Sequence, residues 1–111
     1  MSNELRIFVY VAINDNMSAK QLYRDRFEYD DGLIMEIVVW ELPVPVVGSE
    51  HRYKYSLFYG NAEHGRLVGY DNERPKGDHR HYGDQEEPYT LSSIEQLISD
   101  FMADVKQIRR K

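Results

Sequence analysis

The chain has 111 residues, which is enough for one hydrophobic core and too few for two, so we predict a single domain. Its net charge of −5 argues against a protein that coats nucleic acid through bulk electrostatics, so any contact with RNA or DNA must be local. The absence of cysteine excludes a disulfide framework, a thiolate zinc site and a cysteine nucleophile. The nine tyrosines favour a wet groove or an interface.

The N-terminal region does not match the pattern of a membrane span or of a signal peptide. The apolar run over residues 7–13 is much shorter than a membrane span, and no signal-peptide cleavage pattern follows it. We therefore expect a cytoplasmic protein without a membrane partner. Residues 1–16 are predicted to be a variable N-terminal leader, and residues 17–111 the folded domain.

The middle of the chain predicts an antiparallel sheet. Residues 22–29 and 33–42 are rich in β-formers and flank Asp30-Asp31-Gly32, a hairpin signal. Residues 51–59 alternate, with tyrosines and a leucine on one face and Lys54 among the side chains on the other. Residues 66–70 predict a short fourth strand.

The C-terminal region predicts an amphipathic helix. Ser92 and Glu95 match a capping box, and apolar residues follow at helical spacing. These residues are Ile94, Leu97, Ile98, Phe101, Val105 and Ile108. We therefore predict an α+β fold, with a single antiparallel sheet of about four to six strands packed by this helix.

Between the last predicted strand and the helix lies the polar segment from Tyr70 to Tyr89. It contains His79 and His81, two positions apart. If this piece is extended, both imidazoles leave the same face roughly 6–7 Å apart, close enough to act on one phosphate or one metal ion. We therefore place the candidate site here.

These side chains suit metal-free cleavage of RNA, which needs a base, an acid and a cation beside the phosphate. His79 and His81 could divide the acid and base roles at neutral pH. Lys76 and Arg80 are the candidate phosphate partners, although Arg80 would point to the opposite face of a regular strand. Asp78 is our candidate for orienting a histidine. The substrate-binding candidates are Tyr53, Lys54, Tyr70, Tyr82 and Tyr89, with the tyrosines stacking on a base.

Two other interpretations of the histidines stay open. The first is a zinc, manganese or iron site completed by a carboxylate from Asp71, Asp78, Asp84 or Glu86. The second is a polar strand whose histidines are satisfied by neighbouring carboxylates. Asp71 and Asn72 resemble turn formers more than reactants. We assign no cofactor.

The order of motifs resembles the TumE family, the presumed toxin half of prokaryotic toxin–antitoxin modules. The matching pieces are the DDG hairpin, EIVVWELP, HRYKY, YDN, KGDHRH, the following E.PY and the SIEQLISDF helix. The resemblance runs from about residue 20 to the end. It implies a cognate antitoxin partner, usually DNA-binding, and RNA cleavage as the toxic activity. Homo-oligomerisation stays open.

We therefore predict a toxin of the TumE type, acting as a small metal-independent endoribonuclease. The alternatives are a metal-dependent hydrolase and a protein-binding module whose tyrosines form an interface without catalysis.

Overall fold

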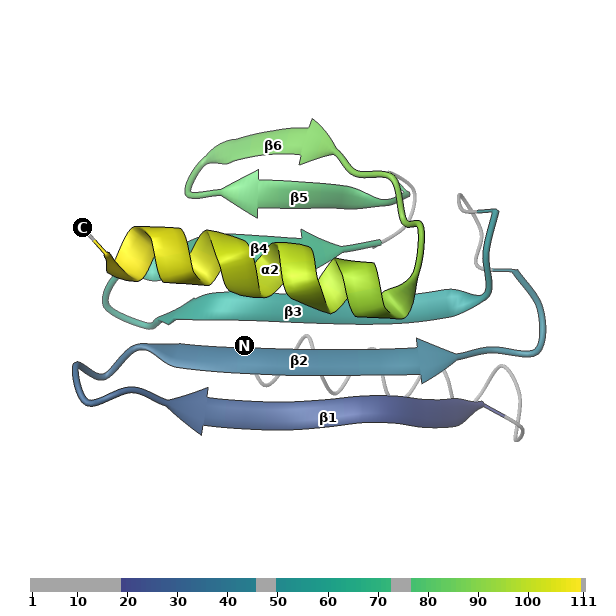
Figure 1. Ribbon diagram of the computed structural model, residues 1–111, viewed down its shortest axis with the longest axis horizontal. Coiled ribbons are helices and arrows are strands. Elements are labelled where there is room, and N and C mark those ends of the chain that lie inside the picture. The colour runs from purple at the N-terminus through teal and green to yellow at the C-terminus, as the bar shows by residue number, and fades with distance from the viewer. Residues whose placement is uncertain (1–18, 46–49, 73–76, 111) are drawn as a thin grey trace.

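The computed structural model describes residues 19–45, 50–72 and 77–110. In these ranges the chain forms one antiparallel sheet in which each strand pairs with the next along the chain, covered by one helix (Figure 1). The elements are β1 (Lys20–Glu28), β2 (Ile34–Glu41), β3 (Tyr53–Asn61), β4 (Gly65–Asp71), β5 (His79–Tyr82), β6 (Gln85–Pro88) and α2 (Ile94–Arg109). The predicted α+β fold with a single antiparallel sheet is confirmed. The predicted leader, residues 1–16, lies outside the described residues.

The β1–β2 hairpin forms at the predicted place. Gly32 adopts a positive φ of 86°, a conformation that side chains other than glycine rarely adopt. The Asp31 carboxylate accepts a hydrogen bond from the Leu33 N–H at 3.1 Å. Local turn chemistry therefore fixes the register of the first two strands.

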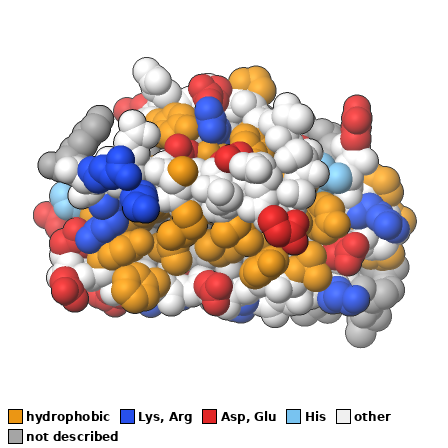
Figure 2. Space-filling model, viewed as in Figure 1, with side chains coloured by type: hydrophobic (Ala, Val, Ile, Leu, Met, Phe, Trp, Pro, Cys, Tyr) orange, Lys and Arg blue, Asp and Glu red, His pale blue; other side chains and the backbone are white. Residues whose placement is uncertain are grey.

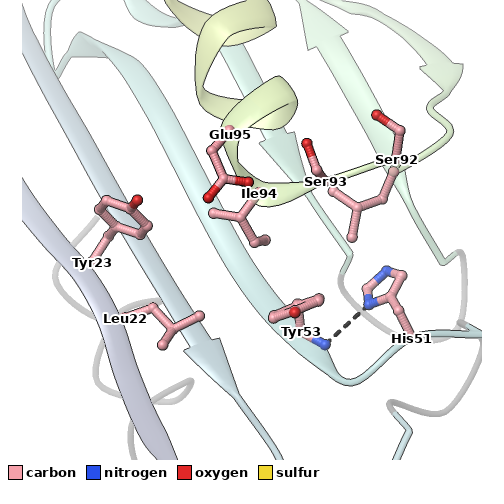
Figure 3. Close-up of a pocket in the computed structure, with 9 residues that line it drawn as sticks. Leu22, Tyr23, His51, Tyr53, Ser92, Ser93, Ile94 and Glu95 are labelled. Atoms are coloured by element: carbon pink, nitrogen blue, oxygen red, sulfur yellow. Dashed lines mark hydrogen bonds between the residues drawn. The ribbon is translucent and has the colours of Figure 1, made fainter.

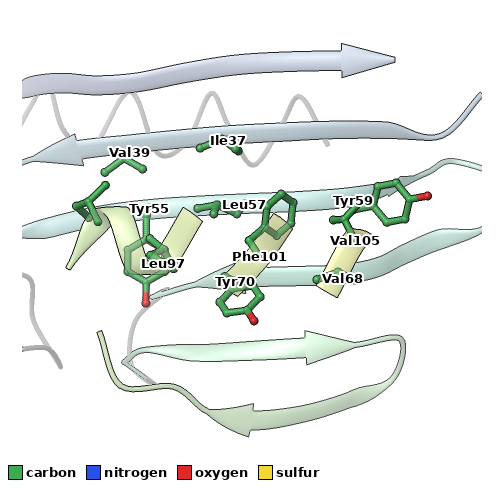
Figure 4. Close-up of a cluster of buried hydrophobic side chains, with 11 residues drawn as sticks. Ile37, Val39, Tyr55, Leu57, Tyr59, Val68, Tyr70, Leu97, Phe101 and Val105 are labelled. Carbon is green, nitrogen blue, oxygen red and sulfur yellow. The ribbon is translucent and has the colours of Figure 1, made fainter. Parts of the chain in front are cut away.

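The core lies between α2 and the middle of the sheet (Figure 4). The helix contacts β3 and β4, and its Leu97 and Phe101 are fully buried. The alternation predicted for β3 is confirmed, because Tyr55, Leu57 and Tyr59 all point into this core. In the part of the chain that the structure describes, no helix is long and apolar enough to cross a membrane.

The helix begins one residue later than the capping box predicted. Ser93, in an extended conformation, is the N-cap, and its hydroxyl accepts a hydrogen bond from the Gln96 N–H at 3.0 Å. Ser93 thus replaces the predicted Ser92 as the N-cap, and the Gln96 side chain donates to Asp100 at 2.8 Å.

Part of the polar segment folds as a hairpin. β5 and β6 pair through a tight turn in which Gly83 has a φ of 57°. The two histidines lie in an extended segment, as their predicted common face requires, since both belong to β5. The pairing of β5 with β4 then adds this hairpin to the edge of the sheet.

Asn72 is a buried bridge between strands, which corrects its interpretation as a turn former. Its amide oxygen accepts a hydrogen bond from the Tyr55 N–H at 3.1 Å, and its amide nitrogen donates to the Tyr53 carbonyl at 2.6 Å. The residue is fully buried. Asn72 therefore continues the β3–β4 pairing beyond the last residue of β4.

We expect Asn72→Ala to lower the free energy of unfolding by about 2–4 kcal/mol, because it leaves a buried N–H and a buried carbonyl without this partner. Urea denaturation monitored by circular dichroism measures the change. The control is Gln21→Ala, an exposed position on the edge strand β1, for which we expect a change within about 0.5 kcal/mol. Equal effects at the two positions would contradict the bridging role.

Candidate functional site

The pleat of β4 and β5 divides the polar side chains between the two faces of the sheet. Asp71 pairs across the strands with His79, and Tyr70 pairs with Arg80. Tyr70 belongs to the core under α2, so Asp71, His79 and His81 point to the other side. We call that side the histidine face and the side covered by α2 the helix face.

His79 is held by hydrogen bonds at both ring nitrogens. Its Nδ1 lies 2.7 Å from the Gly77 carbonyl oxygen, and its Nε2 lies 2.7 Å from Oδ1 of Asp71. A carbonyl oxygen can only accept, so Nδ1 carries a proton and donates it. The 2.7 Å contact at Nε2 then requires a second proton, shared between the ring and the Asp71 carboxylate.

His81 faces the other oxygen of the same carboxylate. Its Nε2 lies 3.8 Å from Oδ2 of Asp71, and its ring meets the His79 ring edge-on with centroids 4.8 Å apart. Both histidines are buried, with 5% and 7% of their surface exposed. Burial, assisted by the positive charge of Arg66, lowers the pKa of His81 below its ordinary value of 6.5. His81 is therefore neutral at physiological pH.

Arg66 and Glu86 complete the polar surroundings of this trio. Arg66 Nη1 lies 3.7 Å from Oδ2 of Asp71, and Glu86 Oε2 lies 3.9 Å from Nε2 of His79. Gly69 leaves space for the Arg66 side chain, because a Cβ at this position would lie 2.5 Å from the Arg66 Cδ. Sequence reasoning missed Arg66 as a site residue, since it was assigned only to the start of a strand.

Of the two predicted phosphate partners, Arg80 does not join this cluster. Lys76 lies outside the described residues. Arg80 points to the helix face, as strand alternation predicted, where it donates from Nε to Glu87 and from Nη1 to the Tyr70 hydroxyl at 3.1 Å. On the histidine face, the Arg66 guanidinium is a cation that lies against the Asp71 carboxylate.

The predicted orienting residue, Asp78, is placed against a different histidine. Both of its oxygens lie at 2.9 and 3.0 Å from Nε2 of His51, and Nδ1 of His51 accepts from the Tyr53 N–H at 3.0 Å. The carboxylate against His79 is that of Asp71, the last residue of β4, which corrects the interpretation of Asp71 as a turn former. Asp84 lies exposed in the β5–β6 turn.

Most of the predicted substrate-binding residues brace the helix against the sheet. The hydroxyls of Tyr70 and Tyr82 donate to Asp104, and the hydroxyl of Tyr89 donates to Asp100 at 2.6 Å. Burial and these carboxylates raise the pKa of all three phenols. Tyr70 is fully buried, so its ring has no exposed surface on which a base could stack.

The other two predicted substrate-binding residues lie on opposite faces. Tyr53 lines a pocket of about 550 Å³ between β1, β3 and the start of α2, and Figure 3 shows His51 hydrogen-bonded beside it. Lys54 lies on the histidine face, two residues from Ser56, the cross-strand partner of Asp71. Both nitrogens of His51 are engaged, so this pocket presents a structural histidine and not a general base.

The fold and site define a small α+β protein with a buried His–Asp–His cluster on the face of its sheet opposite the helix. A family model described as Toxin TumE matches residues 6–109, and the chain therefore belongs to the TumE toxin family. The match begins before residue 20, where the resemblance in the sequence motifs starts. No curated protein and no solved structure gave a match. Membership of a toxin family implies an antitoxin partner.

We expect the ring of His81 to titrate below pH 6.5, and Arg66→Gln to raise its pKa by removing a nearby positive charge. The unfolded chain therefore binds this proton first, so stability should fall as the pH drops from 6.5 through the folded pKa. Two-dimensional NMR of the histidine rings measures both pKa values. An unchanged His81 pKa in Arg66→Gln would show that Arg66 does not act on this ring.

Proposed function

We propose that the toxin is a cytosolic endoribonuclease whose active site is the cluster of Asp71, His79 and His81 with Arg66. The observation that supports this most directly is one carboxylate facing Nε2 of both histidines, at 2.7 and 3.8 Å. This arrangement combines proton-transfer groups with a cation on one face of the sheet. RNA is the proposed substrate, and a DNA-binding antitoxin encoded beside the toxin is the proposed partner.

The roles of the two histidines follow from their different surroundings. His81 is the candidate base for the 2′-hydroxyl, because its lowered pKa favours the neutral ring, in which one nitrogen keeps a lone pair that we assign to Nε2. His79 is the candidate acid for the departing 5′-oxygen, because it shares a proton with Asp71. One metal-free cleavage step would therefore leave a 2′,3′-cyclic phosphate and a 5′-hydroxyl end.

Arg66 is the candidate for stabilising the charge that develops on the phosphate. Its guanidinium is planar and offers paired donors for phosphate oxygens. The side chains of Arg66 and Glu86 are 35% and 33% exposed, compared with 7% for His79, so we expect the phosphate to approach from their side. Lys54, on the same face, remains a proposed substrate-binding residue.

A second candidate function, protein binding without catalysis, is favoured by a different surface. Tyr23 and Phe27 of β1 are 37% and 54% exposed, and apolar side chains line the molecule beside the helix in Figure 2. Aromatic side chains of this kind are enriched in interfaces. Because this surface lies on the helix face, its role can be tested apart from the histidines.

We expect His79→Ala and His81→Ala each to lower the rate of RNA cleavage by about 10²–10⁴-fold, because each removes a proton-transfer group. Growth arrest should disappear with them when the toxin is induced without its antitoxin. Mapping of RNA ends in the cultures and assays with purified protein measure cleavage, and His64→Ala, at an exposed turn, is the matched control.

Antitoxin binding should survive in both variants, since the histidines are buried away from the apolar surface. Growth arrest without new RNA ends would support a toxic role and contradict the proposed ribonuclease activity. Loss of antitoxin binding together with arrest, in a folded variant, would favour the protein-binding function instead.

We expect Arg66→Ala to lower cleavage by about 10²–10³-fold, because it removes a donor that stabilises the transition state. Arg80→Ala should keep most of the activity of the folded protein, because Arg80 lies on the helix face. Single-turnover cleavage of an RNA oligonucleotide compares the two. The reverse order of effects would return the phosphate role to Arg80.

A further inference from the structure

We propose that Asp71, His79 and His81, with Glu86 as a fourth ligand, bind one divalent transition-metal ion of the zinc type, and that this ion inhibits RNA cleavage. The proposed metal binding does not depend on whether the protein cleaves RNA. The inhibition rests on the proposed function, because the ion and the acid–base chemistry need the same Nε2 atoms.

The donor atoms lie close enough to share one ion. One ligand atom from each of Asp71, His79 and His81 lies within 4.8 Å of the other two. Zinc–ligand bonds of about 2.0–2.2 Å place the ligand atoms of a tetrahedral site ~3.4 Å apart. The 2.7 and 3.8 Å contacts of Asp71 involve its two different oxygens, and the donor atoms of the trio lie up to 4.8 Å apart, so closures of up to about 1.4 Å bring them to zinc-binding distances.

The hydrogen bond at the far side of His79 sets the correct tautomer for a ligand. Metal-binding histidines usually donate their other ring N–H to a backbone carbonyl or a carboxylate, which fixes the ring and directs its lone pair at the metal. The Gly77 carbonyl accepts from Nδ1 of His79 in this way at 2.7 Å. The ion would therefore take the place of the proton that Nε2 shares with Asp71.

The site has a fourth donor and a defined ion class. Glu86 Oε2 lies 3.9 Å from Nε2 of His79, and Glu86 is the cross-strand partner of His81, so it projects from the same face. Two imidazoles with carboxylates suit zinc and its neighbours, whereas magnesium and calcium prefer sites made of oxygen atoms. Lower magnesium affinity is therefore part of the proposal.

The charge of Arg66 has opposite effects on the proposed metal binding and on the proposed catalysis. Its positive charge, 3.7 Å from Oδ2 of Asp71, stabilises a phosphate but repels a metal ion. Removing this charge should therefore weaken RNA cleavage and strengthen zinc binding. A variant that merely destabilised the fold would not be expected to weaken RNA cleavage and strengthen zinc binding at the same time.

The test is titration of the purified full-length toxin with Zn²⁺ by isothermal calorimetry, beside Co²⁺ absorption spectra and NMR of the histidine rings. We expect one ion per chain and selective shifts of His79 and His81. Affinity should fall at least about tenfold in His81→Ala and in Asp71→Asn, stay the same in His64→Ala, and rise in Arg66→Ala. Mg²⁺ should not compete.

No zinc binding by the folded wild type, or equal affinity in His81→Ala and His64→Ala, would overturn the site. The NMR arm identifies the ligands in the wild type, so the test does not depend on the folding of a variant. For the inhibition, Zn²⁺ should reduce cleavage and a chelator should leave it intact. If a chelator abolished cleavage, the proposed inhibition by zinc would be wrong, although the binding site would stand. If no cleavage occurred under any condition, only the proposed function would be wrong.

Discussion

The alternation of side chains along β4 and β5 is the constraint on which the whole arrangement depends. Because neighbouring residues of a strand point to opposite faces, Tyr70 and Arg80 face α2 while Asp71 and His79 face away from it. A shift of one residue between these strands would bury Asp71 and the histidines under the helix. The bridge formed by Asn72 beyond the end of β4 holds the adjacent β3–β4 register in place.

The two faces satisfy their buried polar groups by different means. On the helix face, phenol hydroxyls donate to Asp100 and Asp104, carboxylates that lie on α2. These bonds fix the distance and angle between helix and sheet, since the tyrosines lie on β4, on β5 and directly after β6. On the histidine face, the Asp71 carboxylate, the Gly77 carbonyl and the Arg66 guanidinium act on two buried imidazoles, one of which, His81, stays neutral. This second arrangement contains imidazoles, the side chains whose ordinary pKa lies nearest to neutral pH.

Gly69 shows how a residue without a side chain contributes to such a cluster. It is the cross-strand partner of His81, and the space that its missing side chain leaves is filled by Arg66. The guanidinium thereby reaches Oδ2 of the Asp71 carboxylate, whereas His79 contacts Oδ1. Its charge lowers the pKa of His81 and also lies against Asp71, so one arginine influences both partners.

The range over which a sequence signal acts explains which parts of this structure were predictable. Periodicity and turn chemistry correctly predicted the β1–β2 hairpin, the inward face of β3 and the helix, because those signals act over a few residues. The same alternation predicted that His79 and His81 share a face and that Arg80 does not. The partner of His79 could not be predicted in this way, because Asp71 reaches it only through the pairing of two strands. Asp78, adjacent in sequence, was the nearer candidate, but it meets His51 across the sheet instead.

The partly buried carboxylate of Asp71, between two imidazoles, can share either a proton or, as proposed, a metal ion with them. The Gly77 carbonyl fixes the tautomer of His79, so the contact at its Nε2 needs a positive charge. A proton supplies that charge at 2.7 Å, and in the proposed metal site an ion would supply it after the same atoms separate. Arg66 shifts the balance toward the proton, since a cation already beside Asp71 raises the free energy of a second one. Under the two proposals, the charge of Arg66, more than the His-x-His spacing, therefore favours proton transfer over metal coordination.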